Sequence, residues 1–446
     1  PAAKGRGATF YGSTLSVQPE KAALVCASAD REWDSNGTVF GWNPELGNKA
    51  GEFGHNDYYG AVVAACQDLQ LDGRTALIAM LLHDEIRGRL AECFSLKDCF
   101  IDHVLHGAIA TAAVVGAIYK LSVDQIEQAI GMTVAHYVPF RAIRAGHQLS
   151  DSKGASAAFS TEVAFLAVKR AALGFIGPQD IFRNPQAPFR LFCGPEQKFQ
   201  RVGAKGEPNS RSADESPFDL TLTRAGSDFA VMGMHFKLGL YEHQSAGAIQ
   251  ACIDLLASHP ELLLDSGNPI GKIIITAYQP AFGIIGDPAK RDPHTRQSAD
   301  HSMVYIVGTL IRKATEIQRS SWKDLILLPP DYDDLALHHP LTRKLMARIE
   351  FRHGGDEYDR RYPDGIPTSV LIQDGSGASF DSSLVMYPAG HARNHLTSDP
   401  CDLENLLDNK WGQLCRLAKV APSDAISGYG GIGSMTAEEL RAIHQV

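Results

Sequence analysis

Two lysines and two histidines have sequence neighbours that indicate a binding pocket rather than an exposed surface. Lys237 follows the largely apolar run 229–236, and Lys153 opens an Ala-rich helical stretch. His55 and His103 stand at or just before the start of predicted helices. A lysine is rarely buried unless an anion is near, and the N-terminal end of a helix favours anions and neutral imidazole. This set therefore predicts a pocket for a small polyanion, with histidines suited to proton transfer near neutral pH.

Each of these residues has a simpler interpretation when it is taken alone. Lys153 could be an exposed lysine of a first helical turn, and Lys237 could extend a solvated tip from an apolar surface. His55 and His103 could serve only in capping or packing. The combination, rather than any one residue, favours a functional site.

Three further polar residues are candidates for the same pocket. Asp34 and Thr38 belong to the cluster Asp-Ser-Asn-Gly-Thr that follows Trp33. Tyr305 comes four residues after His301, so one helix over 299–314 would place both on one face. Packing of a buried tyrosine is the alternative for Tyr305.

The composition excludes several classes of protein. With 446 residues, 44 % apolar and 21 % charged, the chain has an ordinary globular composition. A net charge of −9 argues against a nucleic-acid partner, and an anionic substrate would need a local positive site. The eight cysteines form no Cys-x-x-Cys pair, which argues against a zinc site or a disulfide framework and favours a reduced compartment. No apolar run reaches the ~18 residues of a membrane span.

One short glycine motif has to be set aside. Residues 428–433 match the dinucleotide-binding fingerprint, but no strand precedes them and too few residues follow for a βαβ unit. We therefore expect a loop there and no nucleotide cofactor.

The pattern of elements changes along the chain. Ala-rich helices are predicted over 58–82, 101–119 and 155–174, and Ser122 is a candidate helix N-cap. Residues 176–228 hold many Pro, Gly, Ser and charged residues, which predicts a long irregular excursion.

The second half is mixed. Helices are predicted over 244–258 and 299–314, and strands over 271–278, 347–351 and 368–372, followed by a hairpin at Asp374-Gly375 with a return strand over 379–387. The last ~45 residues return to helix. This order fits a helical domain that is interrupted by an α+β domain.

Several short motifs together resemble the MmgE/PrpD family. They are His-Asp-Glu-Ile at 83–86, Asp-His-Val-Leu at 102–105, Phe236-Lys237, Arg291-Asp292 with Asp300-His301, and Tyr-Pro-Ala-Gly-His-Ala-Arg at 387–393. The last motif resembles the 2-methylcitrate dehydratase branch in particular. The resemblance covers nearly the whole chain from about residue 20.

The resemblance implies a mainly α fold. A large all-helical domain would be built from both chain ends, residues 1–238 and 396–446, and a smaller α+β lid domain would be inserted at 239–395. The resemblance also implies a homodimer, a small tricarboxylate substrate and no metal or other cofactor. The net charge and the lack of a long apolar run predict neither nucleic acid nor membrane as partner. We expect the mitochondrial matrix as location if the source is eukaryotic and the cytoplasm otherwise. The family's first helices have no match in the sequence, so we expect part of a longer protein.

The family's site residues can be carried over one at a time. Its Asp-x-x-x-Thr element matches Asp34 and Thr38, its two histidines match His55 and His103, its two lysines match Lys153 and Lys237, and its lid tyrosine matches Tyr305. There are departures. Gly37 stands where the family usually has an acid, His-Asn-Asp at 55–57 replaces His-Pro-Ser, and the spacing from Thr38 to His55 is longer than usual.

The implied activity is elimination of water from 2-methylcitrate to give 2-methyl-cis-aconitate, in the methylcitrate cycle of propionate degradation. The residues expected in catalysis are His55, His103, Lys153, Asp34, Thr38 and Tyr305, and those expected to bind substrate are Lys237, Lys153 and Tyr305. Which histidine is the base and which the acid stays open. The alternatives are cis-aconitate decarboxylase of the same family and a non-catalytic tricarboxylate-binding protein.

Overall fold

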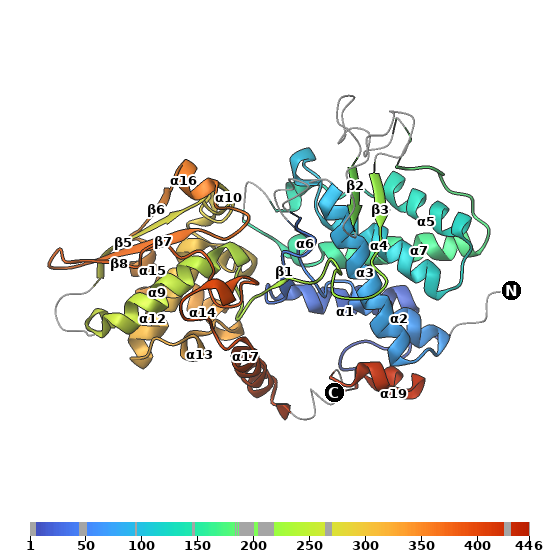
Figure 1. Cartoon of the computed structure of the whole chain (residues 1–446). Coiled ribbons are helices and arrows are strands. Elements are labelled where there is room, and N and C mark those ends of the chain that lie inside the picture. Colours follow the sequence, from blue (N-terminus) through green and yellow to red (C-terminus); the bar gives the residue numbers. More distant parts are fainter. Residues whose placement is uncertain are drawn as a thin grey trace.

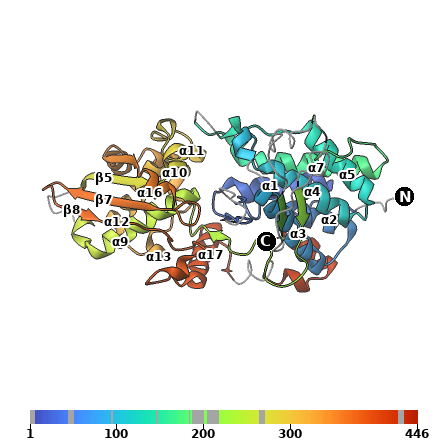
Figure 2. The same ribbon diagram turned by 45° about the horizontal axis from the view of Figure 1, so that its top comes forward.

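The computed structural model describes residues 6–43, 51–93, 96–144, 148–182, 184, 186, 200–203, 218–263, 270–422 and 430–445. These residues form two parts, which Figures 1 and 2 show from two directions. We call them the helical part and the mixed part. The predicted mainly α fold is confirmed.

The helical part contains most of the first 180 residues. Its helices are α1 (Pro19–Glu32), α2 (Tyr59–Leu69), α3 (Gly73–Cys93), α4 (Val104–Ile118), α5 (Val123–His136), α6 (Asp151–Gly154) and α7 (Ser156–Ala172), with short helices η2 (Leu96–Cys99) and η3 (Arg141–Ile143). Two short strands, β2 (Gln200–Gly203) and β3 (Phe218–Thr221), pair in parallel.

Small side chains let the helices of this part approach closely. Helix α4 is buried on nearly all sides and packs against α3, α5 and α7. A Cβ atom added at Gly107 would lie 1.9 Å from the ring of Tyr58, so only glycine fits where α4 passes this tyrosine. Small residues therefore set the path of α4, whose first turn follows His103.

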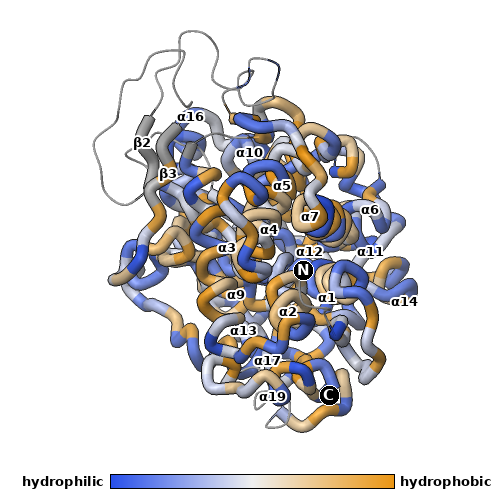
Figure 3. Tube along the Cα trace, turned by 90° about the vertical axis from the view of Figure 1, so that its right-hand side faces the viewer, coloured by the Kyte–Doolittle hydropathy of each residue, from blue (hydrophilic) through white to orange (hydrophobic). Residues whose placement is uncertain are grey.

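The mixed part is built around a four-stranded sheet with the order β6-β5-β7-β8. Its strands are β5 (Ile270–Ala277), β6 (Ile349–His353), β7 (Thr368–Asp374) and β8 (Ser379–Asp381), and only the β5–β6 pair is parallel. Its helices are α9 (Ala246–Ser258), α10 (Gln279–Ile284), α11 (Arg296–Ala299), α12 (Met303–Ile317), α13 (Trp322–Leu325), α14 (Asp334–Leu337), α15 (Pro340–Met346) and α16 (Asp356–Asp359), with short helices η4 (His243–Ser245), η5 (Pro260–Leu263), η6 (Pro288–Lys290), η7 (Pro329–Tyr332) and η8 (Asn394–Leu396). Hydrophobic stretches recur along both parts of the chain in Figure 3.

A minimal antiparallel pairing links segments about 200 residues apart. Strand β1 (Gly37–Thr38) pairs with β4 (His235–Phe236), with Gly37 opposite Phe236 and Thr38 opposite His235. A Cβ atom at Gly37 would lie 2.3 Å from the sulfur of Met234, so glycine permits this approach. The ladder therefore places the chain around Thr38 close to Lys237, which directly follows β4.

The C-terminal helices contact different parts. Helix α17 (Leu403–Ala418) lies against α13 of the mixed part, where Gln413 donates to the Lys323 carbonyl. Helix α19 (Ala437–Ala442), which follows η9 (Ile432–Ser434), packs against α2 of the helical part. The expected domain boundaries stay a prediction.

Most predicted elements appear, with local differences. The capping box of Ser122 with Gln125 starts α5 as predicted. The helical stretch predicted over 58–82 contains α2 and the start of α3, because Gln70 takes a left-handed conformation that ends α2. The described part of the excursion predicted over 176–228 contains β2 and β3, and the return strand predicted over 379–387 ends at Asp381. Among the helices that the structure describes, none combines the length and apolar character needed to cross a bilayer.

Candidate active site

A cavity lies where the two parts of the molecule meet, and charged side chains line it. The basic residues in its lining include Arg31, Arg141, Arg144, Lys153, Lys237 and Lys290, and the acidic residues are Asp34, Glu52 and Glu242. Five of the residues expected from the sequence line this cavity, namely Asp34, Thr38, His103, Lys153 and Lys237. His55 and Tyr305 do not appear in the lining.

Lys237 and Asp34 form a buried ion pair at the cavity wall. The ammonium of Lys237 donates to Oδ1 of Asp34, and Arg31 lies 3.5 Å from the same carboxylate. Burial alone would raise the pKa of Asp34, but the charges of Lys237 and Lys153, with those of His301 and Arg31, hold it well below its usual value. Asp34 is therefore ionised, and it orients the lysine that follows β4.

Lys153 is a buried cation whose hydrogen-bonding capacity is unused. It lies in the short helix α6 with 1 % of its surface exposed, and its Nζ has no hydrogen-bond acceptor among the described residues. The nearest carboxylate oxygen is Oδ1 of Asp300, at 3.7 Å. Burial lowers the pKa of Lys153 to about 8, and the carboxylates of Asp300 and Asp34 oppose that shift. An anion in the cavity would supply the missing acceptor.

His103 is held by a carboxylate on one ring nitrogen. Its Nδ1 lies 2.7 Å from Oε1 of Glu52, whose other oxygen lies 2.8 Å from Nδ1 of His106. Nη2 of Arg144 lies 3.3 Å from Nε2 of His103. Because a guanidinium can only donate, this geometry assigns the proton to Nδ1 and leaves a lone pair on Nε2.

The partners of His103 are fixed in their turn. Arg144 donates to both oxygens of Asp102 and to Ser156. Burial would raise the pKa of Glu52, but His103, with His106 and Arg87, keeps it well below its usual value. A charged Glu52 therefore fixes both the tautomer and the direction of the imidazole.

His301 is a lining residue to which sequence reasoning assigned no role. Its Nδ1 lies 2.5 Å from Oδ1 of Asp300, and its Nε2 lies 3.2 Å from Oδ2 of Asp34. Burial and the charge of Lys153 lower the pKa of His301 to about 4, although both carboxylates oppose this. The Asp300-His301 pair was visible in the sequence as one of the family motifs, but no periodicity indicated its contact with Asp34.

Glu52, Arg144 and Tyr362 were also missed. Glu52 stands three residues before His55 in a Gly-Glu-Phe-Gly segment that has no helical or strand pattern. Tyr362 lines the cavity from the mixed part. Only the folded chain shows that these residues line the same cavity as His103 and the two lysines.

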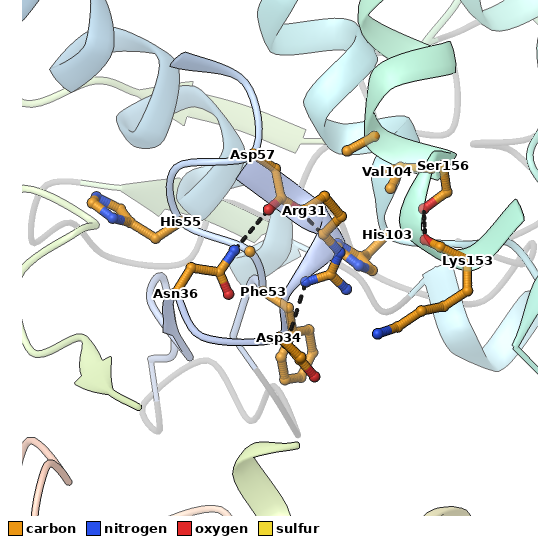
Figure 4. A network of polar contacts seen from close by, with 12 residues as sticks. Arg31, Asp34, Asn36, Phe53, His55, Asp57, His103, Val104, Lys153 and Ser156 are labelled. Atoms are coloured by element: carbon orange, nitrogen blue, oxygen red, sulfur yellow. Dashed lines mark hydrogen bonds and ion pairs between the residues drawn. The ribbon is translucent and has the colours of Figure 1, made fainter. Parts of the chain in front are cut away.

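Thr38 lines the cavity as expected, and His55 lies elsewhere. Oγ1 of Thr38 is buried and has no hydrogen-bond partner among the described residues. Nε2 of His55 lies 2.8 Å from the hydroxyl of Tyr59 and 3.0 Å from Oδ2 of Asp84. Figure 4 shows His55 pointing away from His103 and Lys153. The structure therefore separates His55 from the pocket in which the sequence placed it.

Tyr305 belongs to the core of the mixed part. It has no exposed surface, and its hydroxyl donates to the carbonyl of Asp331 at 2.7 Å. Helix α12 begins at Met303, after the N-cap Ser302, so His301 precedes the helix. The prediction that His301 and Tyr305 share a helix face is wrong for this reason.

The assembled cavity is suited to removing a proton beside a carboxylate. The lone pair of His103 can accept a proton. The ammonium groups of Lys153 and Lys237 can stabilise charge that builds on a carboxylate. Glu242, another lining residue, has a pKa raised to about 7 by burial and by nearby Asp34, so the cavity also holds a carboxyl group able to carry a proton near neutral pH. No group of three or more His, Cys, Asp or Glu side chains in the described part of the chain is arranged to hold a metal ion.

Comparisons with known proteins extend over most of the chain. The family model for the MmgE/PrpD N-terminal domain matches residues 2–200, and the model for the MmgE/PrpD C-terminal domain matches residues 241–416. Similar proteins include 2-methylcitrate dehydratase of Escherichia coli, which is 22 % identical over 88 % of this chain and 76 % of its own length. The mitochondrial 2-methylcitrate dehydratase of Yarrowia lipolytica is 26 % identical over 89 % of this chain and 71 % of its own length. A probable 2-methylcitrate dehydratase of Saccharomyces cerevisiae is 24 % identical over 86 % and 70 % respectively.

Proposed function

The chain belongs to the MmgE/PrpD family, and from this premise we propose that it is a hydro-lyase that eliminates water from 2-methylcitrate. The product would be 2-methyl-cis-aconitate, formed in the methylcitrate cycle of propionate degradation. The names of the similar proteins support this substrate.

One observation carries the proposal. The ammonium of Lys153 is buried without a hydrogen-bond acceptor among the described residues, and it lines the same cavity as His103, whose unprotonated Nε2 faces Nη2 of Arg144 at 3.3 Å. A carboxylate of the substrate would satisfy Lys153, and the carbon next to it would present its proton to His103. The contact between Lys153 and the substrate carboxylate would then contribute both to binding and to deprotonation.

In the proposed mechanism, His103 removes the proton from the methyl-bearing carbon that lies next to a carboxylate. Lys153 and Lys237 stabilise the negative charge that develops on this carboxylate. The electron pair forms the carbon–carbon double bond as the neighbouring C–O bond breaks. Glu242 is the proposed acid, and its proton leaves with the hydroxyl as water. Asp34 and Thr38 would orient the lysine and the substrate, and the proposed chemistry needs no cofactor.

The test is turnover of 2-methylcitrate by chelator-treated protein, followed by the ultraviolet absorbance of the conjugated product. A rise in absorbance that tracks enzyme concentration is the expected result. No rise, with and without added divalent metal, would reject the proposal. Release of carbon dioxide from cis-aconitate without dehydration of 2-methylcitrate would instead identify the decarboxylase. Calorimetric binding of 2-methylcitrate without turnover would identify a binding protein.

The family-based expectations on assembly and location belong to the same proposal. We propose a homodimer, to be measured by sedimentation equilibrium. We propose the mitochondrial matrix as the compartment in a eukaryote and the cytoplasm in a bacterium. Localisation of the tagged full-length protein would test this part.

A further inference from the structure

Two cavity cations lie apart from the ion pairs described above. Arg141 comes from η3 of the helical part, and Lys290 comes from η6 of the mixed part. The other basic residues named in the lining each face a carboxylate: Arg31 and Lys237 face Asp34, Arg144 faces Asp102, and Lys153 faces Asp300. Among these six basic residues, Arg141 and Lys290 are therefore the two that have no carboxylate at ion-pair distance within the described part of the chain.

Lys290 is buried without a close partner. It has 4 % of its surface exposed, and within the described ranges no hydrogen bond or ion pair joins its ammonium to another residue. The side chain of Arg141 likewise has no hydrogen-bond or ion-pair partner among the described residues. Asp102 is the carboxylate whose charge acts on Arg141, and it already accepts two hydrogen bonds from Arg144.

Burial is the main reason why the charged form of Lys290 is disfavoured. Burial lowers the pKa of Lys290, and the like charges of Arg141 and Arg144 add to this effect. Glu242 and Asp287 act in the opposite direction, but the pKa stays below its usual value. The surroundings of Lys290 therefore disfavour its charge as long as no further anion is present.

Neutral hydrogen bonds hold these like charges together across the two parts. Nε2 of Gln148 donates to the carbonyls of Ala289 and Asp292, and its Oε1 accepts from the backbone N–H of His294. Next to it, the backbone N–H of Leu149 donates to Ser298 at 2.7 Å. The segment that carries Lys290 is thus fixed to the helical part close to Arg141, although the charges repel. An arrangement of this kind is favourable when a bound anion lies between the cations.

We infer that Arg141 and Lys290 form a subsite for a second carboxylate of the substrate, separate from the carboxylate held by Lys153 and Lys237. The inference refines the proposed function, because it makes a ligand with at least two well-separated carboxylates the preferred class. The ligand would also join the helical part to the mixed part, since one residue comes from each.

The test measures binding without turnover, so it can be separated from the test of the proposed function. Isothermal calorimetry would compare tricarballylate, which has three carboxylates, with propionate, which has one. The variants are Lys290→Gln, Arg141→Gln, the charge-preserving Lys290→Arg, and Lys344→Gln as a control at an exposed lysine outside the cavity lining. Thermal melting of each variant would check its folding.

We expect Lys290→Gln and Arg141→Gln each to weaken tricarballylate binding by about 10- to 100-fold, and Lys290→Arg to recover most of that loss. Propionate binding should stay within about twofold of the unmodified protein, as should every affinity of Lys344→Gln. Unchanged tricarballylate affinity in Lys290→Gln, or equal losses for both ligands, would overturn the subsite. If tricarballylate binding depends on Lys290 but the protein does not dehydrate 2-methylcitrate, the subsite stands and the proposed function is rejected.

Discussion

The surroundings of His103 and of His55 are built from the same kinds of groups. Each imidazole lies within 3.0 Å of a buried carboxylate, Glu52 for His103 and Asp84 for His55. The difference is in which ring nitrogen meets the carboxylate, Nδ1 in His103 and Nε2 in His55. Nε2 of His103 faces Arg144 and the cavity, whereas Nε2 of His55 is already taken by Asp84 and Tyr59. A histidine–carboxylate pair is thus a sign of chemistry only where the imidazole also lines the cavity, as His103 does and His55 does not.

The largest expected effect comes from removing the available imidazole. If His103 is the base, His103→Ala should lower kcat by about 10²–10⁴-fold, because proton transfer loses its acceptor. Steady-state kinetics on 2-methylcitrate would measure this. Near-normal turnover would remove His103 from the mechanism, and His103 and His55 would then no longer differ in their role.

Loss of the charge on Glu52 should have the next largest effect. Glu52→Gln retains the side-chain shape but weakens the bond that fixes the imidazole, so we expect kcat to fall by about 10–100-fold. The alkaline and acid limbs of the pH–rate profile should also move, and Glu52→Asp should recover part of the rate. An unchanged pH profile with lower thermal stability would mean that Glu52 only supports the fold.

The pH dependence should report on Lys153. Its pKa of about 8 means that the ammonium is charged below that pH and neutral above it. Because only the charged form attracts a carboxylate, kcat/KM should fall above pH 8, by about tenfold for each pH unit. Lys153→Arg should remove this limb, since guanidinium stays charged. Persistence of the limb in the arginine variant would assign it to another group.

His55→Ala should affect stability more than turnover. We expect kcat to fall by less than about fivefold, and the free energy of unfolding to fall by about 1–2 kcal/mol as the bonds to Asp84 and Tyr59 are lost. Turnover and urea unfolding together would test this. A loss as large as that of His103→Ala would restore the role implied by the family resemblance and contradict the geometry of the cavity.

The smallest effect is expected at Tyr305. Tyr305→Phe removes only the hydroxyl that donates to the Asp331 carbonyl, so the free energy of unfolding should fall by about 1 kcal/mol at unchanged kcat. Denaturant unfolding and steady-state kinetics would measure the two quantities. A large loss of kcat without a loss of stability would return Tyr305 to the site.

The sequence predicted the elements better than their contacts. Helix α5 and strand β7 could be predicted, because a capping box and a β-rich run are local signals. Lys153 and Lys237 could be predicted as pocket residues, because charge in small or apolar surroundings needs an explanation. The contact of His301 with Asp34 could not, since it depends on how the two parts meet. The place of Glu52 could not either, since it depends on the packing of its segment against Arg87 of α3 and His106 of α4.

His55 and Tyr305 lie outside the cavity lining for two different reasons. The sequence places His55 in the pocket through its position before a helix and its match to the family, but in the structure its Nε2 lies 3.0 Å from Oδ2 of Asp84. The spacing of four residues between His301 and Tyr305 does not place them on one helix face, because the helix starts after His301. Residue spacing predicts a shared helix face only when both residues lie within one helix whose ends are known.

The short ladder between β1 and β4 has a consequence for how the protein acquires its activity. Gly37 and Phe236 pair across about 200 residues, and only two residues on each side support the pairing. Closing so long a loop costs much chain entropy and gains little until both flanking parts have folded. During refolding from urea, helical circular dichroism should therefore recover before the ladder joins Asp34 to Lys237, and catalytic activity should be among the last properties to return.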